Sequence, residues 1–233
     1  MKLTTQEIAQ MIDLSCVRTT SSKSDIEEMV AAARKYQFGQ VSVLQCFIPY
    51  TWQLLQGAEN IHVVGNVSFP TGSDSTTVKV VQAKEMVETG CDEIDVVINV
   101  GKLRSGALSE VEADLKAVVE AARPLPVKVI IEVMVLTPEE LQIACEICLR
   151  VGVTFIKTGT GWAQRGTTVG DVRMIKTIIG ERAKIKASGG IRNLDTVVEL
   201  YQAGARRFGV NLKSGIEIVE ECLARGGVVE IPE

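Results

Sequence analysis

Histidine is almost absent from this sequence, since His62 is the only one among 233 residues. A metal centre built from several histidines is therefore excluded, and no pattern of carboxylates indicates another kind of metal site. Runs of basic residues are also lacking, and the formal net charge is −4 with both signs mixed along the chain. We therefore expect neither a nucleic acid nor an anionic membrane surface as a partner.

Long apolar stretches are missing as well. No run approaches the roughly 20 residues that a membrane-spanning helix needs. The first seven residues are mostly polar and lack the apolar core of a signal peptide. We therefore predict a cytoplasmic protein without a membrane segment.

Cysteines are few, and most lie in apolar segments, as is typical of reduced, buried thiols. They are Cys16, Cys46, Cys91, Cys145, Cys148 and Cys222. Cys145 and Cys148 have C-x-x-C spacing, but they lie in the middle of a predicted helix without a second cysteine pair. We interpret them as helix-packing residues rather than a redox or metal site.

What the chain does contain is a regular alternation of short apolar strands and amphipathic helices. Apolar residues make up 46% of the composition, which is enough for one full core. We predict strands at residues 12–17, 40–44, 62–67, 93–98 and 127–132, two more that end in Lys157 and Lys186, and an eighth at 207–210. A short leading helix at residues 5–11 precedes them, and a capping box at Ser24 predicts the next helix start.

Eight such units in about 230 residues match a (β/α)8 TIM barrel, and we predict one domain over residues 1–233. Apolar strands such as Val127–Ile131 suit a parallel sheet that is covered on both faces. A doubly wound open sheet is the alternative. It would normally carry a glycine fingerprint after the first strand, where this chain has Arg18-Thr19-Thr20-Ser21.

Two of the strands end in lysine and open into glycine-rich loops, at Lys157 and Lys186. If these strands are parallel neighbours, the two ammonium groups lie close together and repel, which lowers at least one pKa. A lysine that is neutral near pH 7 can attack a carbonyl carbon and form a Schiff base. The alternative for each lysine is a side chain that simply extends to solvent.

A carboxylate inside an apolar strand, Asp95, is the third candidate. Its burial is costly unless a cation pairs with it, so it is either a structural ion pair or part of a proton relay with a lysine. Asp13 on the first strand is a similar case. Ser188, Gly189 and Gly190 precede a helix, and their backbone amides could hold an anion or could merely form a tight turn.

Four segments resemble the signature stretches of the deoxyribose-phosphate aldolase family. They read EIDVVINVG (93–101), KVIIE (128–132), FIKT (155–158) and KASGGIR (186–192), and the resemblance extends in order over nearly the whole chain. It implies a cofactor-free class I aldolase on a (β/α)8 barrel that reversibly cleaves 2-deoxyribose 5-phosphate to glyceraldehyde 3-phosphate and acetaldehyde. By that resemblance Lys157 is the Schiff-base lysine, Lys186 lowers its pKa, and Asp95 is the acid/base residue.

The same resemblance leads us to expect a small phosphorylated sugar or aldehyde as the ligand, and we expect a homodimer. The predicted substrate-binding residues are Asp13, Thr158, Ser188, Gly189, Gly190, Asn211 and Lys213.

The chain departs from the family pattern at three places. Gly159 stands where serine is usual, Ser42 stands where many members carry cysteine, and the loop at residues 209–215 lacks the usual Gly-x-Ser-Ser phosphate motif. Lys213 or Arg165 could replace the lost donors. Two other readings therefore stay open: an imine-forming aldolase for a different aldehyde or keto acid, and a non-catalytic barrel that binds a sugar phosphate.

Overall fold

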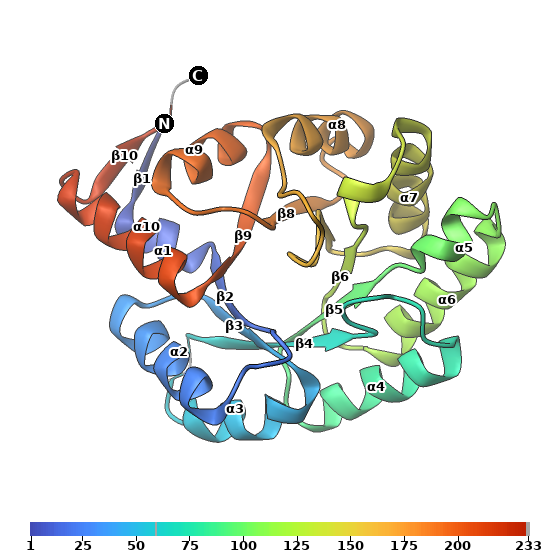
Figure 1. Cartoon of the computed structure of the whole chain (residues 1–233), viewed down its shortest axis with the longest axis horizontal. Coiled ribbons are helices and arrows are strands. Elements are labelled where there is room, and N and C mark those ends of the chain that lie inside the picture. Colours follow the sequence, from blue (N-terminus) through green and yellow to red (C-terminus); the bar gives the residue numbers. More distant parts are fainter. Residues whose placement is uncertain (59, 232–233) are drawn as a thin grey trace.

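The computed structural model describes residues 1–58 and 60–231, and its strands form a closed parallel barrel in chain order with helices around the outside (Figure 1). The strands are β2 (Ile12–Cys16), β3 (Gln40–Val43), β4 (His62–Val67), β5 (Glu93–Val97), β6 (Val127–Ile130), β7 (Phe155–Lys157), β8 (Lys184–Ser188) and β9 (Ala205–Asn211). The predicted (β/α)8 barrel is confirmed, and the open-sheet alternative is wrong. Residues 59, 232 and 233, which the one-domain prediction includes, lie outside the described residues.

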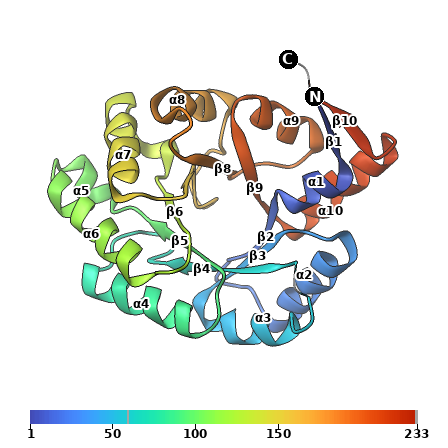
Figure 2. The ribbon, with the colours of Figure 1, turned by 180° about the vertical axis from the view of Figure 1, so that it is seen from behind.

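Helices follow the barrel strands and cover the outside of the sheet (Figures 1 and 2). They are α2 (Lys23–Tyr36), α3 (Ile48–Leu54), α4 (Thr76–Glu88), α5 (Val100–Arg104), α6 (Leu108–Ala121), α7 (Pro138–Val151), α8 (Val169–Ile179), α9 (Leu194–Gln202) and α10 (Leu212–Ala224). Single 3₁₀ turns lie at Gln45–Phe47 and Val133–Val135.

Most helix starts follow from capping chemistry. Thr137 and Glu140 form the predicted capping box of α7, and Asn193 caps α9. The start predicted at Ser24 is wrong, because the cap is Ser22, whose hydroxyl and backbone amide pair with Asp25. Helix α5 was not predicted; its short, glycine-containing segment carries too weak a periodicity to stand out.

The two ends of the described chain meet outside the barrel (Figure 2). Strands β1 (Lys2–Thr4) and β10 (Val228–Glu230) pair antiparallel, an arrangement that the sequence analysis did not predict. The predicted leading helix is α1 (Thr5–Gln10), which runs directly into β2 and therefore lies at the amino ends of the barrel strands.

The barrel interior is polar at one level, although its strands are largely apolar. On β6, Val127 and Val129 face the helices, while Lys128 points inward and is the register partner of Asp95 on β5. Side chains in adjacent register on parallel strands share a face, so the charged residues meet inside the ring. Among the described residues, no helix is both long and apolar enough to cross a membrane.

Candidate active site

The two predicted lysines are direct neighbours in the barrel. Lys157 ends β7 and is the register partner of Lys186 on β8. Both are buried, with 5% and 1% of their surface exposed. Both Nζ atoms bond the same oxygen, Oδ2 of Asp95, at 2.7 and 3.0 Å. The structure thus brings together the three residues that the sequence singled out for chemistry.

Asp95 lies beneath the lysines and is fully buried. Burial alone would raise its pKa, but the charges of Lys128, Lys157 and Lys186 outweigh this and hold the pKa well below its usual range. It has no exposed surface, and it lines neither the cavity of about 860 Å³ at the carboxyl ends of the strands nor the cavity of about 20 Å³ beside Lys157. The hydrogen bonds of the Asp95 carboxylate therefore go to the lysines, and the acid/base role stays a prediction.

Lys128 belongs to the same group of charged residues and was not singled out from the sequence. Its Nζ donates to Asp95 Oδ1 at 2.9 Å and also pairs with Glu93, and its side chain is completely buried. The available signal was a lone lysine inside the apolar run Val127–Ile131. The sequence shows this lysine, but it does not show that Asp95 is its partner, because the register between two strands cannot be derived from one strand alone.

The two catalytic candidates have opposite pKa shifts. Burial is the largest cause that lowers the pKa of Lys157, and the charge of Lys186 adds to it, so that the pKa is about 8 despite the opposing Asp95. Burial also opposes the charged form of Lys186, but the carboxylates of Asp13 and Asp95 outweigh it and raise that pKa. The predicted repulsion between lysines is therefore a contributor, while desolvation is the dominant cause.

The charge balance of the whole cluster agrees with these shifts. Among the described residues the connected ion pairs join four cations with three carboxylates: Lys128, Lys157, Lys186 and Arg207 with Asp13, Glu93 and Asp95. With Lys157 protonated, the cluster holds one excess positive charge in a largely buried place. Loss of a proton from Lys157 makes the cluster neutral, which favours the free amine.

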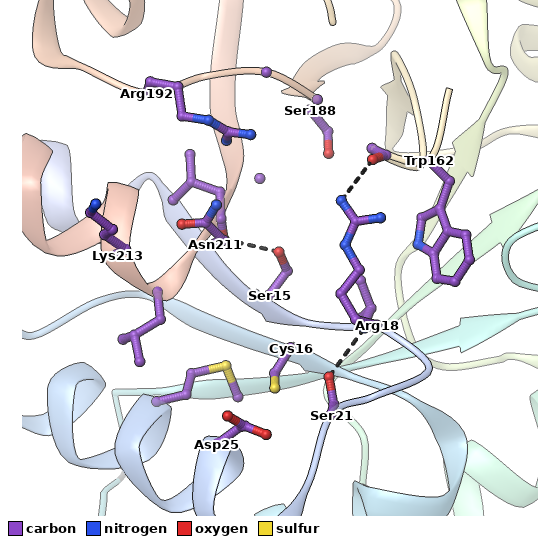
Figure 3. Close-up of a pocket in the computed structure, with 18 of the residues that line it drawn as sticks. Ser15, Cys16, Arg18, Ser21, Asp25, Trp162, Ser188, Arg192, Asn211 and Lys213 are labelled. Atoms are coloured by element: carbon purple, nitrogen blue, oxygen red, sulfur yellow. Dashed lines mark hydrogen bonds between the residues drawn. The ribbon is translucent and has the colours of Figure 1, made fainter. Parts of the chain in front are cut away.

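A cavity of about 860 Å³ lies at the carboxyl ends of the strands (Figure 3). It shares Ser15 and Ser188 with a smaller cavity that both lysines line. Of the predicted substrate-binding residues, Ser188, Gly189, Gly190, Asn211 and Lys213 line it. Gly189 and Gly190 have φ values of 102° and 80°, a conformation in which other residues are strained. The carboxyl ends of the strands, where the cavity lies, are the usual location of active sites in such barrels.

Two of the predicted substrate residues, Asp13 and Thr158, also make contacts within the protein, and Asp13 lines a small cavity together with both lysines. Asp13 is buried and pairs with Lys186. The Thr158 hydroxyl accepts from the Ser188 amide at 2.9 Å and donates to the Ser188 carbonyl at 3.1 Å, which ties the loop after β7 to β8. Asn211 lines the cavity, but its side chain also caps α10 by accepting from the Ser214 amide.

Arg18 and Trp162 were not predicted as site residues, yet they form one side of the cavity. Arg18 donates to the Gly161 carbonyl at 3.2 Å, and its guanidinium lies 5.3 Å from the centre of the Trp162 ring. Figure 3 shows Arg18 between Ser188 and Trp162, with Arg192 and Lys213 farther along the cavity. Within the described residues, the guanidinium groups of Arg18 and Arg192 donate to backbone carbonyls and pair with no carboxylate, so both charges can meet an anionic ligand.

Arg165, which the sequence offered as a replacement phosphate donor, points elsewhere. Its guanidinium bonds both carboxylate oxygens of Asp171, at 2.7 and 3.1 Å, and it does not line the cavity. Asp171 closes the capping box of α8 with Thr168, so the arginine stabilises a helix start. That interpretation of Arg165 is wrong for this reason.

A family model described as DeoC/LacD family aldolase matches residues 8–216, which is most of the chain. The chain belongs to this aldolase family. The deoxyribose-phosphate aldolase of Klebsiella pneumoniae is 40% identical over 223 residues, which is 95% of this chain and 90% of the relative. That of Carboxydothermus hydrogenoformans is 43% identical over 218 residues, which is 92% and 94% of the two chains.

Solved structures agree with this family membership. A protein described as QR15, an aldolase, superposes with a TM-score of 0.88 at 37% identity and covers 94% of this chain and 97% of its own. The deoxyribose phosphate aldolase of Aeropyrum pernix, whose structure is described as tetrameric, has a TM-score of 0.87. At 24% identity and 95% and 93% coverage, it shows the shared fold alone.

The structure explains one departure from the pattern of this aldolase family. A Cβ atom on Gly159 would lie 2.6 Å from Met134 Cε and 2.8 Å from Glu132 Oε1. Glu132 already accepts from the Thr160 amide and hydroxyl, at 3.1 and 2.6 Å. A serine at 159 would displace this arrangement, so the glycine keeps the loop after Lys157 closely packed.

Proposed function

We propose that this member of the aldolase family is a class I aldolase that cleaves 2-deoxy-D-ribose 5-phosphate to D-glyceraldehyde 3-phosphate and acetaldehyde through an imine on Lys157. The observation that carries the proposal is the buried Lys157, which shares Asp95 with a second buried lysine and lines a small cavity that adjoins the substrate-sized one. Burial lowers the pKa of Lys157 to about 8, which agrees with this role. The names of the similar aldolases support the substrate. The reaction needs no cofactor, because the imine itself withdraws electrons.

The proposed steps assign one role to each group. Neutral Lys157 attacks C1 of the open-chain sugar phosphate, and loss of water gives a protonated imine. The C3 hydroxyl then loses its proton, the C2–C3 bond breaks, and the electron pair moves into an enamine on Lys157. Protonation at C2 and hydrolysis release acetaldehyde. Lys186 lines the small cavity beside Lys157 and is protonated because its pKa is raised. It gives the proton with which water leaves, then takes the C3 hydroxyl proton, returns it at C2, and is reprotonated when the imine is hydrolysed, while Asp95 positions both lysines.

Imine formation should depend on pH with a midpoint near 8. Below its pKa Lys157 is protonated and cannot attack, so the rate should rise about tenfold per pH unit up to pH 8 and then level off. The measurement is the initial rate at which cyanoborohydride traps the acetaldehyde adduct, followed by intact mass from about pH 6 to pH 10. A rate that keeps rising to pH 10 would show an ordinary lysine. Absence of any adduct would favour the non-catalytic barrel.

Arg192 and Arg18 are proposed to hold the phosphate of the substrate. Replacement of Arg192 by alanine should lower the ratio of kcat/KM for 2-deoxyribose 5-phosphate over unphosphorylated 2-deoxyribose. Loss of one charge-assisted hydrogen bond costs about 1.5–3 kcal/mol, which corresponds to a roughly ten- to hundredfold decrease in this ratio. Arg18→Ala should act in the same direction. Arg34→Ala is the control, since that exposed arginine bonds the Leu54 carbonyl away from the cavity. An unchanged ratio in both variants would place the phosphate elsewhere.

We also propose that the whole chain forms one domain, that the protein is a homodimer, and that it is cytoplasmic. The tetrameric Aeropyrum pernix relative shows that this fold supports assembly in at least that protein. An aldolase of the same chemistry for a different aldehyde remains the second candidate function. It is favoured by the substitution of the phosphate loop at residues 209–215, where Asn211 caps a helix.

A further inference from the structure

A pair of buried polar side chains lies beside the lysines and takes no part in the mechanism above. Ser42 on β3 and Asn66 on β4 face the barrel interior and are 2% and 5% exposed. Asn66 Nδ2 donates to Ser42 Oγ at 2.9 Å and to the Val43 carbonyl at 3.0 Å. Both N–H groups of the amide are therefore used within the protein.

The other end of the same amide is unsatisfied. Asn66 Oδ1 is buried and has no hydrogen-bond partner in the part of the chain that the structure describes. The amide cannot simply be turned around, because the Val43 carbonyl only accepts hydrogen bonds and so requires the nitrogen on its side. A buried acceptor without a partner is costly, which indicates that a donor from outside the protein fills the place.

A small cavity next to this pair has the size of one polar group. It measures about 20 Å³, close to the space of a single water molecule, and Asn66, Ser42, Lys157 and Lys186 are among its lining residues. It shares Ser15 and other lining residues with the 860 Å³ cavity, so the two spaces adjoin. A ligand bound covalently to Lys157 would thus place its first atoms against Asn66 and Ser42.

We propose that Asn66 and Ser42 form a subsite for a hydroxyl group on the carbon next to the carbonyl of the donor aldehyde, so that the enzyme uses 2-hydroxyaldehydes such as glycolaldehyde. This rests on the proposed aldolase function and extends its substrate range. The hydroxyl donates to Asn66 Oδ1 and accepts from the Ser42 hydroxyl, whose oxygen already accepts from Asn66. Acetaldehyde has only hydrogen at this position and leaves Oδ1 to a water molecule.

The reaction balances without any further reactant. The Lys157 amine adds to the glycolaldehyde carbonyl and water leaves, which forms the imine. Loss of a proton from the hydroxyl-bearing carbon gives the enamine, which forms a carbon–carbon bond to C1 of D-glyceraldehyde 3-phosphate, whose oxygen takes up a proton. Hydrolysis consumes one water, which balances the one lost on imine formation, frees Lys157 and releases an aldopentose 5-phosphate that keeps its 2-hydroxyl.

The test compares two donors at fixed D-glyceraldehyde 3-phosphate, with the phosphorylated products measured by mass spectrometry. The wild type should condense both acetaldehyde and glycolaldehyde. Asn66→Leu, which keeps the size of the side chain, should lower the ratio of kcat/KM for glycolaldehyde over acetaldehyde by roughly ten- to a hundredfold. Ser42→Ala should also lower this ratio. Because it removes only one hydroxyl group, this variant tests the subsite even if Asn66→Leu does not fold.

Ser15→Ala is the matched control, because Ser15 lines the same small cavity but already donates to the Val210 carbonyl at 2.9 Å. Its ratio should stay within about twofold of the wild type. Failure with both donors would refute the aldolase function itself. Turnover of acetaldehyde without glycolaldehyde, or a ratio that neither variant changes, would overturn the subsite alone and leave the aldolase standing.

Discussion

Replacement of Lys157 by alanine should lower kcat for 2-deoxyribose 5-phosphate cleavage by at least about 10⁴-fold, the order seen when a covalent nucleophile is removed. The variant should also give no adduct with acetaldehyde under cyanoborohydride. The physical reason is that Lys157 combines a cavity position with a pKa of about 8, whereas the pKa of Lys186 is raised. Turnover and peptide mapping of the trapped adduct provide the measurement.

Lys184→Ala is the matched control for this experiment. Lys184 lies on the same strand as Lys186 but is exposed and packs over the Phe155 ring, 5.7 Å from its centre. Its removal should change kcat less than about threefold. The Lys157 variant should fold normally, since it relieves the cluster of its excess charge, and thermal unfolding checks this. Wild-type turnover in Lys157→Ala, or an adduct mapped to Lys186, would end the assignment.

Asp95→Asn should lower the pKa of Lys157 and should also lower turnover, for two different reasons. The carboxylate charge supports the protonated form of Lys157, so its loss should shift the midpoint of imine trapping below pH 8. Turnover should nevertheless fall by about 10²- to 10⁴-fold, because Lys157 and Lys186 lose the group that holds both nitrogens. Three buried lysines would also lose a shared counter-charge, which should cost roughly 3–5 kcal/mol in unfolding free energy.

Asp114→Asn controls for the stability part of this prediction. Asp114 pairs with the buried Lys79 at 2.6 Å between α4 and α6, away from both cavities near the lysines. This variant should lose stability of a similar order, yet keep the trapping midpoint near 8. Urea unfolding and the pH dependence of trapping distinguish the two variants. If Asp95→Asn left the midpoint in place, the proposed electrostatic coupling would be wrong.

Those features of the protein that depend on local information could be predicted from the sequence. Alternating apolar strands and helices predicted the barrel, and parallel strands place their carboxyl ends at one edge, which predicted that Lys157 and Lys186 are neighbours. The prediction of Arg165 as a phosphate donor was wrong, because its ion pair with Asp171 depends on the path of the loop between them. It also missed Arg18 and Trp162, which come from loops that meet only across the cavity.

The sequence by itself determined the barrel, the order of its strands, and which strand ends carry amines and glycines. These follow from side-chain periodicity and from the residues that begin and end each element, all within a few positions along the chain. Only the tertiary structure decided that Lys128 and Asp13 complete the charge cluster and that burial outweighs repulsion at Lys157. It also decided that the Asn66 side-chain oxygen finds no partner among residues 1–58 and 60–231. The reason is that register between distant strands and the loss of water around a side chain are properties of the closed ring.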